Sequence, residues 1–130
     1  MDNRKNDKYY INKVIENIDY ITKYTNNLSY DEYSDNDLII DAVVFRLVQM
    51  VENINHISKE YKDSHPDIEW GLIVGFRNGI VHDYGKTDYT IVYEIVTEDI
   101  TRLRNLLVKE TQFFHHIGLI KCLYLCLYNT

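Results

Sequence analysis

The chain has 130 residues, which is long enough for one compact domain and too short for two ordinary ones. Hydrophobic residues make up 45% of it, and it contains one proline and five glycines. So few turn-forming residues disfavour a domain of many short strands and favour a few long helices. The formal net charge of -6 counts against a broad nucleic-acid-binding surface, which needs clustered lysine and arginine. A small local site built around one or two arginines remains compatible with this charge.

The same sequence features indicate the cellular compartment. Residues 1–8 are polar and charged, and they lack the apolar core of a signal peptide. The two cysteines, Cys122 and Cys126, do not make a disulfide framework. No run of residues reaches the roughly 18 apolar positions that a membrane-spanning helix needs. We therefore expect a cytoplasmic protein in a reducing environment, without a membrane partner.

The first half of the chain predicts two helices. Residues 9–28 carry apolar side chains at helical spacing, and residues 29–36 form a polar connection. The second helix is expected to begin near Ser34 or Asp35, which are good capping residues with acids in the first turn. Its apolar positions continue at steps of three or four as far as Tyr61. This pattern predicts a helix of about seven turns, the longest in the chain.

The second half predicts two more helices. The sequence Ser64-His65-Pro66-Asp67 marks a stop and a restart, so a third helix is expected from Pro66 to about Ile80, with Gly85 as its terminator. Apolar residues lie on most sides of this helix, which predicts that it is the most buried one. A fourth helix is expected from residue 87 or 88 to about residue 110. Four helices with short connections predict an all-α fold, an antiparallel four-helix bundle.

The last twenty residues have a different character. Residues 111–130 contain no Asp or Glu and a single lysine, Lys121, and they are rich in Phe, Ile and Leu. Left exposed, such a segment would form an adhesive apolar patch. We expect a fifth helix, or else a strand-like arm, that packs on the bundle or on a partner. A membrane-surface helix is disfavoured because basic residues are nearly absent. We therefore divide the chain into a bundle domain at 1–110 and an apolar C-terminal extension at 111–130.

One short stretch combines residue types with chemical potential. Arg77, His82 and Tyr84 lie where an apolar helix meets a polar loop. Arginine can hold a phosphate through two parallel hydrogen bonds, and histidine can move a proton near neutral pH. Together they can make or break a phosphodiester without a metal. Asn78 completes the candidate site, whereas Gly79 is expected to permit close helix approach rather than to act in the chemistry.

The spacing within this stretch does not place the two residues side by side. In a straight helix, positions 77 and 82 differ by about 140° around the axis. Three arrangements would bring Arg77 and His82 together. The long arginine side chain can reach around the helix, the helix can be distorted near Gly79, or a cleft between two chains can combine two copies of each residue at a two-fold axis.

The pattern Arg77-Asn78-x-x-Val81-His82-x-Tyr84 closely resembles the Arg-x4-His-x-Tyr motif of HepT-like proteins of the HEPN superfamily. Residues 61–70 resemble the family's lead-in to the motif helix, and residues 91–100 resemble the helix that follows it. The resemblance covers about residues 8–110. The extension at 111–130 departs from the family pattern.

This resemblance implies both a fold and an activity. It implies a homodimeric helical bundle with the motif at the dimer cleft, and a toxin that cleaves RNA without metal or cofactor. Arg77 and His82 would be the catalytic residues, and Asn78 would support the cleft. The implied partner is a small nucleotidyltransferase antitoxin of the MntA type, which transfers AMP to the motif tyrosine, here Tyr84.

The residue types suit that chemistry. His82 would take the proton from an RNA 2'-hydroxyl or give one to the leaving oxygen, and Arg77 would neutralise charge on the phosphoryl oxygens. Asn78 would orient His82 or contact the phosphate. AMP on Tyr84 would add bulk and negative charge two residues from His82, filling the cleft and occupying Arg77 electrostatically.

The sequence leaves a second class of function open. The chain would then be a noncatalytic, dimeric, nucleotide-associated binding module that docks a nucleotidyltransferase and can hold its nucleotide, which the acidic charge favours. Arg77 would be a structural ion-pair residue, and for Glu52 and Arg46 an ordinary interhelix ion pair is favoured over a place in the cleft. His115, His116, Cys122 and Cys126 match no zinc-ligand spacing, so no metal site is expected.

Overall fold

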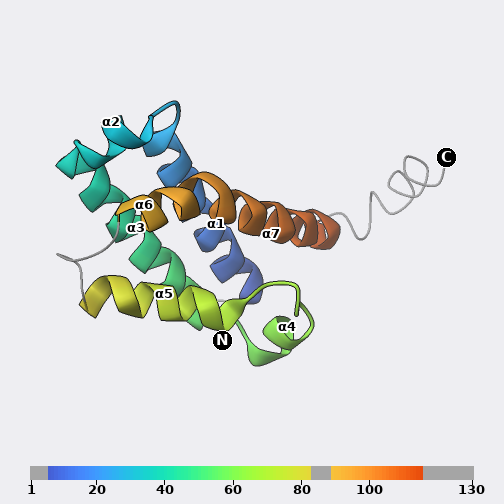
Figure 1. Cartoon of the computed structure of the whole chain (residues 1–130). Coiled ribbons are helices and arrows are strands. Elements are labelled where there is room, and N and C mark those ends of the chain that lie inside the picture. Colours follow the sequence, from blue (N-terminus) through green and yellow to red (C-terminus); the bar gives the residue numbers. More distant parts are fainter. Residues whose placement is uncertain (1–5, 83–88, 116–130) are drawn as a thin grey trace.

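The computed structural model describes residues 6–82 and 89–115, and every regular element in these ranges is helical (Figure 1). The expected all-α fold is therefore confirmed. The elements are α1 (Asp7–Thr25), α2 (Tyr30–Ser34), α3 (Asp37–Asn55), α4 (Lys59–Asp63), α5 (Trp70–His82), α6 (Tyr89–Glu94), the π-helical turn η2 (Ile95–Asp99) and α7 (Ile100–His115).

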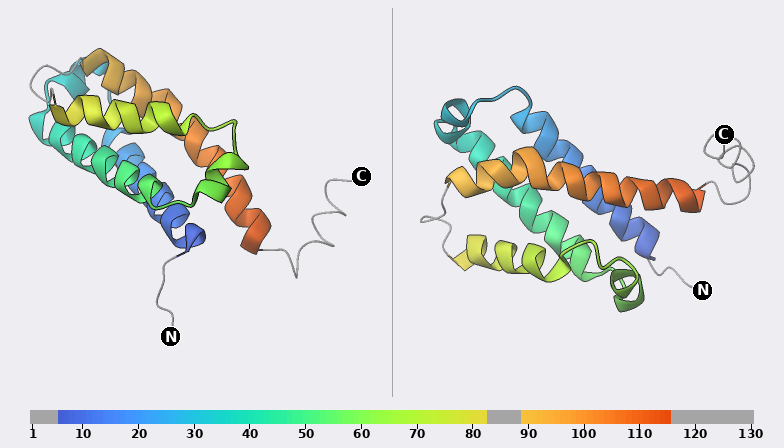
Figure 2. Two further views of the ribbon diagram at one scale, coloured as in Figure 1. Left: turned by 90° about the horizontal axis from the view of Figure 1, so that it is seen from below. Right: turned by 45° about the vertical axis from the view of Figure 1, so that its right-hand side comes forward.

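Four long rods make the bundle. Helices α1 and α3 form its central pair, α5 packs on α3, and the rod made of α6, η2 and α7 packs on α1. Figure 2 shows α5 and α7 on one side of this central pair, running in opposite directions. The core between the rods is aliphatic, and its fully buried members include Ile18, Ile21, Leu47, Ile54 and Leu107.

The connection between the first two long helices has structure of its own. Residues 29–36, expected to be a polar loop, contain the short helix α2. Ser29 and Glu32 form a reciprocal capping box, in which the Glu32 N–H donates to Ser29 Oγ at 3.2 Å and the Ser29 N–H donates to Glu32 Oε1 at 3.1 Å. The following long helix begins after Asn36, whose Oδ1 accepts from the Ile39 N–H at 3.1 Å. The expected start at Ser34 or Asp35 is wrong because Asn36 is the capping residue.

The second predicted helix is broken. It ends at Asn55, and α4 begins after Ser58, whose Oγ caps it by accepting from the Tyr61 N–H at 3.1 Å. Ser58 is also bound by Asp7 at the start of α1, through its N–H at 2.8 Å and its hydroxyl at 2.6 Å. Ile57 and Tyr61 remain buried on both sides of the break. The apolar periodicity therefore continues although the helix does not.

The third predicted helix differs from expectation in its start and its burial. It begins at Trp70 rather than Pro66, and its expected terminator Gly85 lies outside the described residues. It is not the most buried helix, because Leu72 is 68% exposed and Gly71 and Gly75 are also exposed. The reason is its position: α5 lies at the edge of the bundle and takes its main support from α3 alone.

The fourth rod is continuous from Tyr89 to His115, and its expected first residues lie outside the described ranges. A π-helical turn interrupts it at Ile95–Asp99. Four-residue steps drift by about 40° each in a regular α-helix, and a wider turn corrects this drift. Val92, Val96 and Ile100 are accordingly all buried. Helix α7 also continues beyond Glu110, where the boundary between the two domains is expected, so it joins the bundle to the extension without a break up to His115.

None of the helices in the described part of the chain combines the length and apolarity needed to cross a membrane.

The core position of α3 can be tested with one substitution and a matched control. Leu47 is 1% exposed, so Leu47→Ala removes buried methyl groups and leaves a cavity; we expect a loss of about 2–5 kcal/mol in the free energy of unfolding. Leu38 lies on the same helix and is 83% exposed, so Leu38→Ala should change stability by no more than about 0.5 kcal/mol. Urea denaturation measures both, and equal effects would contradict the packing described here.

Candidate active site

The start of α5 is fixed by a tryptophan. The Trp70 Nε1–H points to the carbonyl oxygens of Lys62 and His65, each at 3.2 Å, and the Trp70 ring meets the Tyr61 ring edge-on at 6.2 Å between centroids. These contacts attach α5 to α4 and the turn after it. Ile80, near the other end of α5, is 2% exposed. The helix that carries the motif is thus fixed near both ends.

Arg77 is oriented by two partners. Its Nη2 donates to Glu52 Oε1 of α3 at 2.6 Å, and its Nη1 donates to Asn78 Oδ1 at 3.0 Å. The Arg77 side chain keeps 27% of its surface exposed, and its Nε is buried without a hydrogen-bond partner within the described residues. A guanidinium has five N–H donors. The group is therefore held in place while donors remain for an additional anion.

The structure relates the other motif residues to Arg77 in different ways. Asn78 is exposed and lies against Arg77, so in this structure it positions the arginine. His82 is the last residue of α5, and only its backbone is described. Tyr84 lies outside the described residues, so its expected modification has no structural counterpart here.

The helix between Arg77 and His82 is regular. Helix α5 continues through Gly79 to His82, and none of the described glycines has a positive φ. The second of the three expected arrangements, a distortion near Gly79, is therefore absent. Positions 77 and 82 differ by about 140° around the helix and about 7.5 Å along it. Arg77 points to α3, whereas position 82 faces a different side of α5.

That other side is formed by glycines. Gly71, Gly75 and Gly79 are exposed, and a Cβ added at any of them would meet nothing within 4 Å. Their four-residue spacing places them along one stripe of α5, which we call the glycine ridge. At about 100° per residue, position 82 falls within the arc that these three glycines span. The ridge allows another helix to approach the backbone of α5 closely beside His82.

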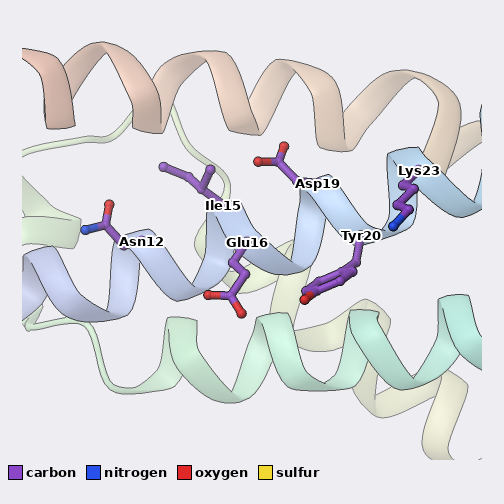
Figure 3. A pocket seen from close by; sticks show the side chains of 6 residues that line it. All are labelled: Asn12, Ile15, Glu16, Asp19, Tyr20 and Lys23. Atoms are coloured by element: carbon purple, nitrogen blue, oxygen red, sulfur yellow. The ribbon is translucent and has the colours of Figure 1, made fainter.

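Two other candidate features lie away from this site. The Arg46 guanidinium stacks on the Tyr20 ring of α1 at 3.9 Å and donates to Asn17 Oδ1 at 3.4 Å, so Arg46 does not join Arg77. An open depression of about 350 Å³ lies along α1 (Figure 3). Its member Asp19 is bound by Arg104 Nε of α7 at 2.6 Å, which is an ordinary interhelix ion pair. Of the candidate metal ligands, Cys122, Cys126 and His116 lie outside the described ranges, and within those ranges no group of three potential ligands occurs.

Comparison with known proteins decides the family. The sequence profile of the family described as Ribonuclease HepT-like matches residues 14–110, three quarters of the chain. The chain belongs to the HepT-like family. The resemblance to HepT-like proteins of the HEPN superfamily is thereby confirmed, and the matched region ends within α7, before the apolar extension.

Individual relatives are distant in sequence, but each alignment below covers most of this chain and most of the relative. The chain is 27% identical over 97 residues to "Putative RNase MJ1380" of Methanocaldococcus jannaschii, spanning 75% of this chain and 89% of that protein. It is 29% identical over 97 residues to "Putative RNase MJ1216" of the same organism, spanning 75% and 80%. It is 25% identical over 101 residues to "Probable ribonuclease HepT" of Thermococcus cleftensis, spanning 78% and 92%. No solved structure matches the chain.

The Glu52–Arg77 contact makes a testable distinction between a structural and a functional arginine. The side chains are 47% and 27% exposed, so the ion pair is solvent-screened and contributes no more than about 1 kcal/mol. We expect Glu52→Gln to lower the free energy of unfolding by that amount or less in urea denaturation. A loss of about 3 kcal/mol or more would instead identify a buried structural ion pair.

Proposed function

We propose that this HepT-like chain is a metal-independent ribonuclease and the toxin of a toxin–antitoxin pair. The observation that carries the proposal is the state of Arg77. Its guanidinium is partly exposed, is held by Glu52 and Asn78, and keeps unused donors on the helix that ends at His82. The family membership supports the same activity, since relatives of this chain bear the name ribonuclease.

The proposed reaction uses the RNA itself as nucleophile. A 2'-hydroxyl loses its proton to His82 and attacks the adjacent phosphorus, the bond from phosphorus to the 5'-oxygen breaks, and that oxygen receives a proton. Arg77 stabilises the negative charge on the phosphoryl oxygens. The products are a 2',3'-cyclic phosphate and a 5'-hydroxyl. One histidine cannot be base and acid in the same step, so two copies of His82 suit this chemistry better than one.

The glycine ridge supports a site shared between two chains. Because α5 is regular, Arg77 and position 82 face different sides of one helix. If a second chain packs its α5 on the ridge, the His82 positions of both chains lie at the interface, beside Asn78 and within reach of a long arginine side chain. We propose a homodimer with this composite cleft.

We further propose that the activity is switched off by a nucleotidyltransferase of the MntA type. The Tyr84 hydroxyl would attack the α-phosphorus of ATP, with pyrophosphate as leaving group, and the AMP would remain two residues from His82. Its phosphate would compete with RNA for Arg77.

The second candidate function is a noncatalytic dimeric module that docks such a nucleotidyltransferase. One observation favours it: Glu52 already neutralises Arg77 at 2.6 Å in a chain of net charge -6, which weakens attraction for RNA phosphates.

Substitution of His82 separates the two functions. In the ribonuclease proposal, induced wild-type protein arrests growth and purified protein cleaves RNA in the presence of a chelator. His82→Ala should lower the cleavage rate at least about 100-fold, because general acid–base catalysis contributes that much. His56→Ala is the matched control, since His56 is exposed at the end of α3 and stacks on Tyr10 outside the motif. Wild-type protein that neither arrests growth nor cleaves RNA would favour the binding module.

The same strains test the partner. With the nucleotidyltransferase co-expressed, intact mass spectrometry should find wild-type protein heavier by one AMP group and Tyr84→Phe unchanged. Tyr24→Phe is the control among the twelve tyrosines and should still gain the group. Co-purification of the partner without added mass would again favour the module.

The composite cleft has its own test on the ridge. Nothing lies within 4 Å of a Cβ at Gly75, so Gly75→Leu should leave the single chain folded and raise its helix propensity by up to about 1 kcal/mol. In a dimer the same side chain would separate the two α5 helices. We expect loss of the dimer in analytical ultracentrifugation and loss of cleavage together. Asn105→Leu, at an exposed position of α7, should affect neither. An active Gly75→Leu monomer would rule out the shared site.

A further inference from the structure

The side of α5 next to the glycine ridge borders an apolar groove. It has a volume of about 420 Å³ and lies between α5 on one side and η2 and α7 on the other. Its floor contains the buried residues Leu47, Met50 and Leu103. Its walls include Phe76 of α5 and Leu106 of α7, both only partly buried.

The groove exists because α5 and α7 each pack on a helix of the central pair and not closely on each other. Helix α5 packs on α3 and helix α7 packs on α1, without extensive backbone contact between α5 and α7 in the described residues. The left view of Figure 2 shows the two rods on the same side of the central pair. Leu72, at the lip of the groove, is 68% exposed, so the apolar lining continues onto the surface of α5.

The rim of the groove is acidic. Asp67 and Glu69 precede α5 and line one side, and Asp99 lines the other, where it accepts from Arg102 Nη2 at 2.9 Å. Three carboxylates around one arginine repel RNA phosphates, so the groove is not an extension of the RNA site. It suits an apolar chain segment with few charges, none of them negative.

We propose that residues 116–130 of the same chain fold back from the end of α7 and cover this groove. This segment contains no Asp or Glu and carries Lys121, which complements the acidic rim. Ile120, Leu123 and Leu127 recur at steps of three or four, the spacing of one apolar helix face. Gly118 follows closely after α7, and glycine is the residue that most often allows a helix to end and the chain to turn.

The segment is long enough to reach the groove. Leu106 lines the groove and His115 is the last residue of α7, nine positions later, which corresponds to about 14 Å along the helix. The 12 residues that follow Gly118 span about 18 Å as a helix and up to about 40 Å when extended. The segment can therefore return antiparallel to α7 and lie along Phe76 and Leu72. It would give α5, which carries Arg77, a second support besides α3.

The chain carries natural probes for this contact, because its two cysteines, Cys122 and Cys126, both lie in the segment. Leu72→Cys places a third thiol at the exposed lip of the groove, and Leu38→Cys places one at a more exposed site on α3 outside the groove lining. After mild oxidation of the full-length protein, non-reducing electrophoresis and peptide mass mapping identify the disulfides. We expect the thiol introduced at position 72 to pair with Cys122 or Cys126 within one chain at least about tenfold faster than the thiol introduced at position 38.

Two results would overturn the proposal. Disulfides between position 72 of one chain and Cys122 or Cys126 of another would show that a second copy supplies the segment, and equal rates at positions 72 and 38 would show that the groove is not its docking site. A measurement without added cysteines gives an independent check. Leu72→Glu should increase the reactivity of Cys122 and Cys126 toward a thiol reagent several-fold, and Leu38→Glu should not. The test does not depend on RNA cleavage, so it stands or fails separately from the proposed ribonuclease function.

Discussion

The whole arrangement depends on the apolar packing of α3. Its buried side chains meet α1 over most of its length, and the same helix is the main support of α5. Glu52, which orients Arg77, projects from α3 as well. The core that stabilises the bundle and the contact that positions the candidate catalytic arginine therefore come from one helix. A change in how α3 packs would move Glu52 relative to α5 and would therefore alter the orientation of Arg77.

Hydrophobic periodicity was sufficient to predict the all-α class and the four rods, because each rod buries one continuous apolar stripe. It was not sufficient to predict helix breaks at places where the pattern of buried residues continues although the helix ends. Ile57 and Tyr61 continue the stripe of α3, yet Ser58 between them turns away to bind Asp7, a contact between residues 51 positions apart. The π-helical turn at Ile95–Asp99 could not be predicted from the periodicity either. It keeps apolar residues four positions apart on one face of the rod, so the sequence pattern looks like that of a regular helix.

The burial of α5 could not be predicted from its composition. Trp70, Leu72 and Phe76 suggested a helix surrounded by core, but Leu72 and the three glycines leave one side of it exposed among the described residues. For the site, the motif located Arg77 in the sequence and could not identify its partner. Glu52 lies 25 residues earlier and on another helix, and an acid on α3 was expected to form only an ordinary interhelix pair. The pair is between helices, and it also fixes the direction of the guanidinium.

The three glycines of α5 have a consequence for local stability. Gly71 is the second residue of the helix, but Gly75 and Gly79 lie in its interior, where each glycine is less favourable than alanine by up to about 1 kcal/mol; the two together weaken α5 by up to about 2 kcal/mol relative to alanine at the same positions. We therefore expect this helix to open more readily than α1 or α3. A molecule that binds the open side of α5 in its folded form therefore also stabilises the helix against local opening. Binding there and the local stability of the segment that carries Arg77 are thermodynamically linked.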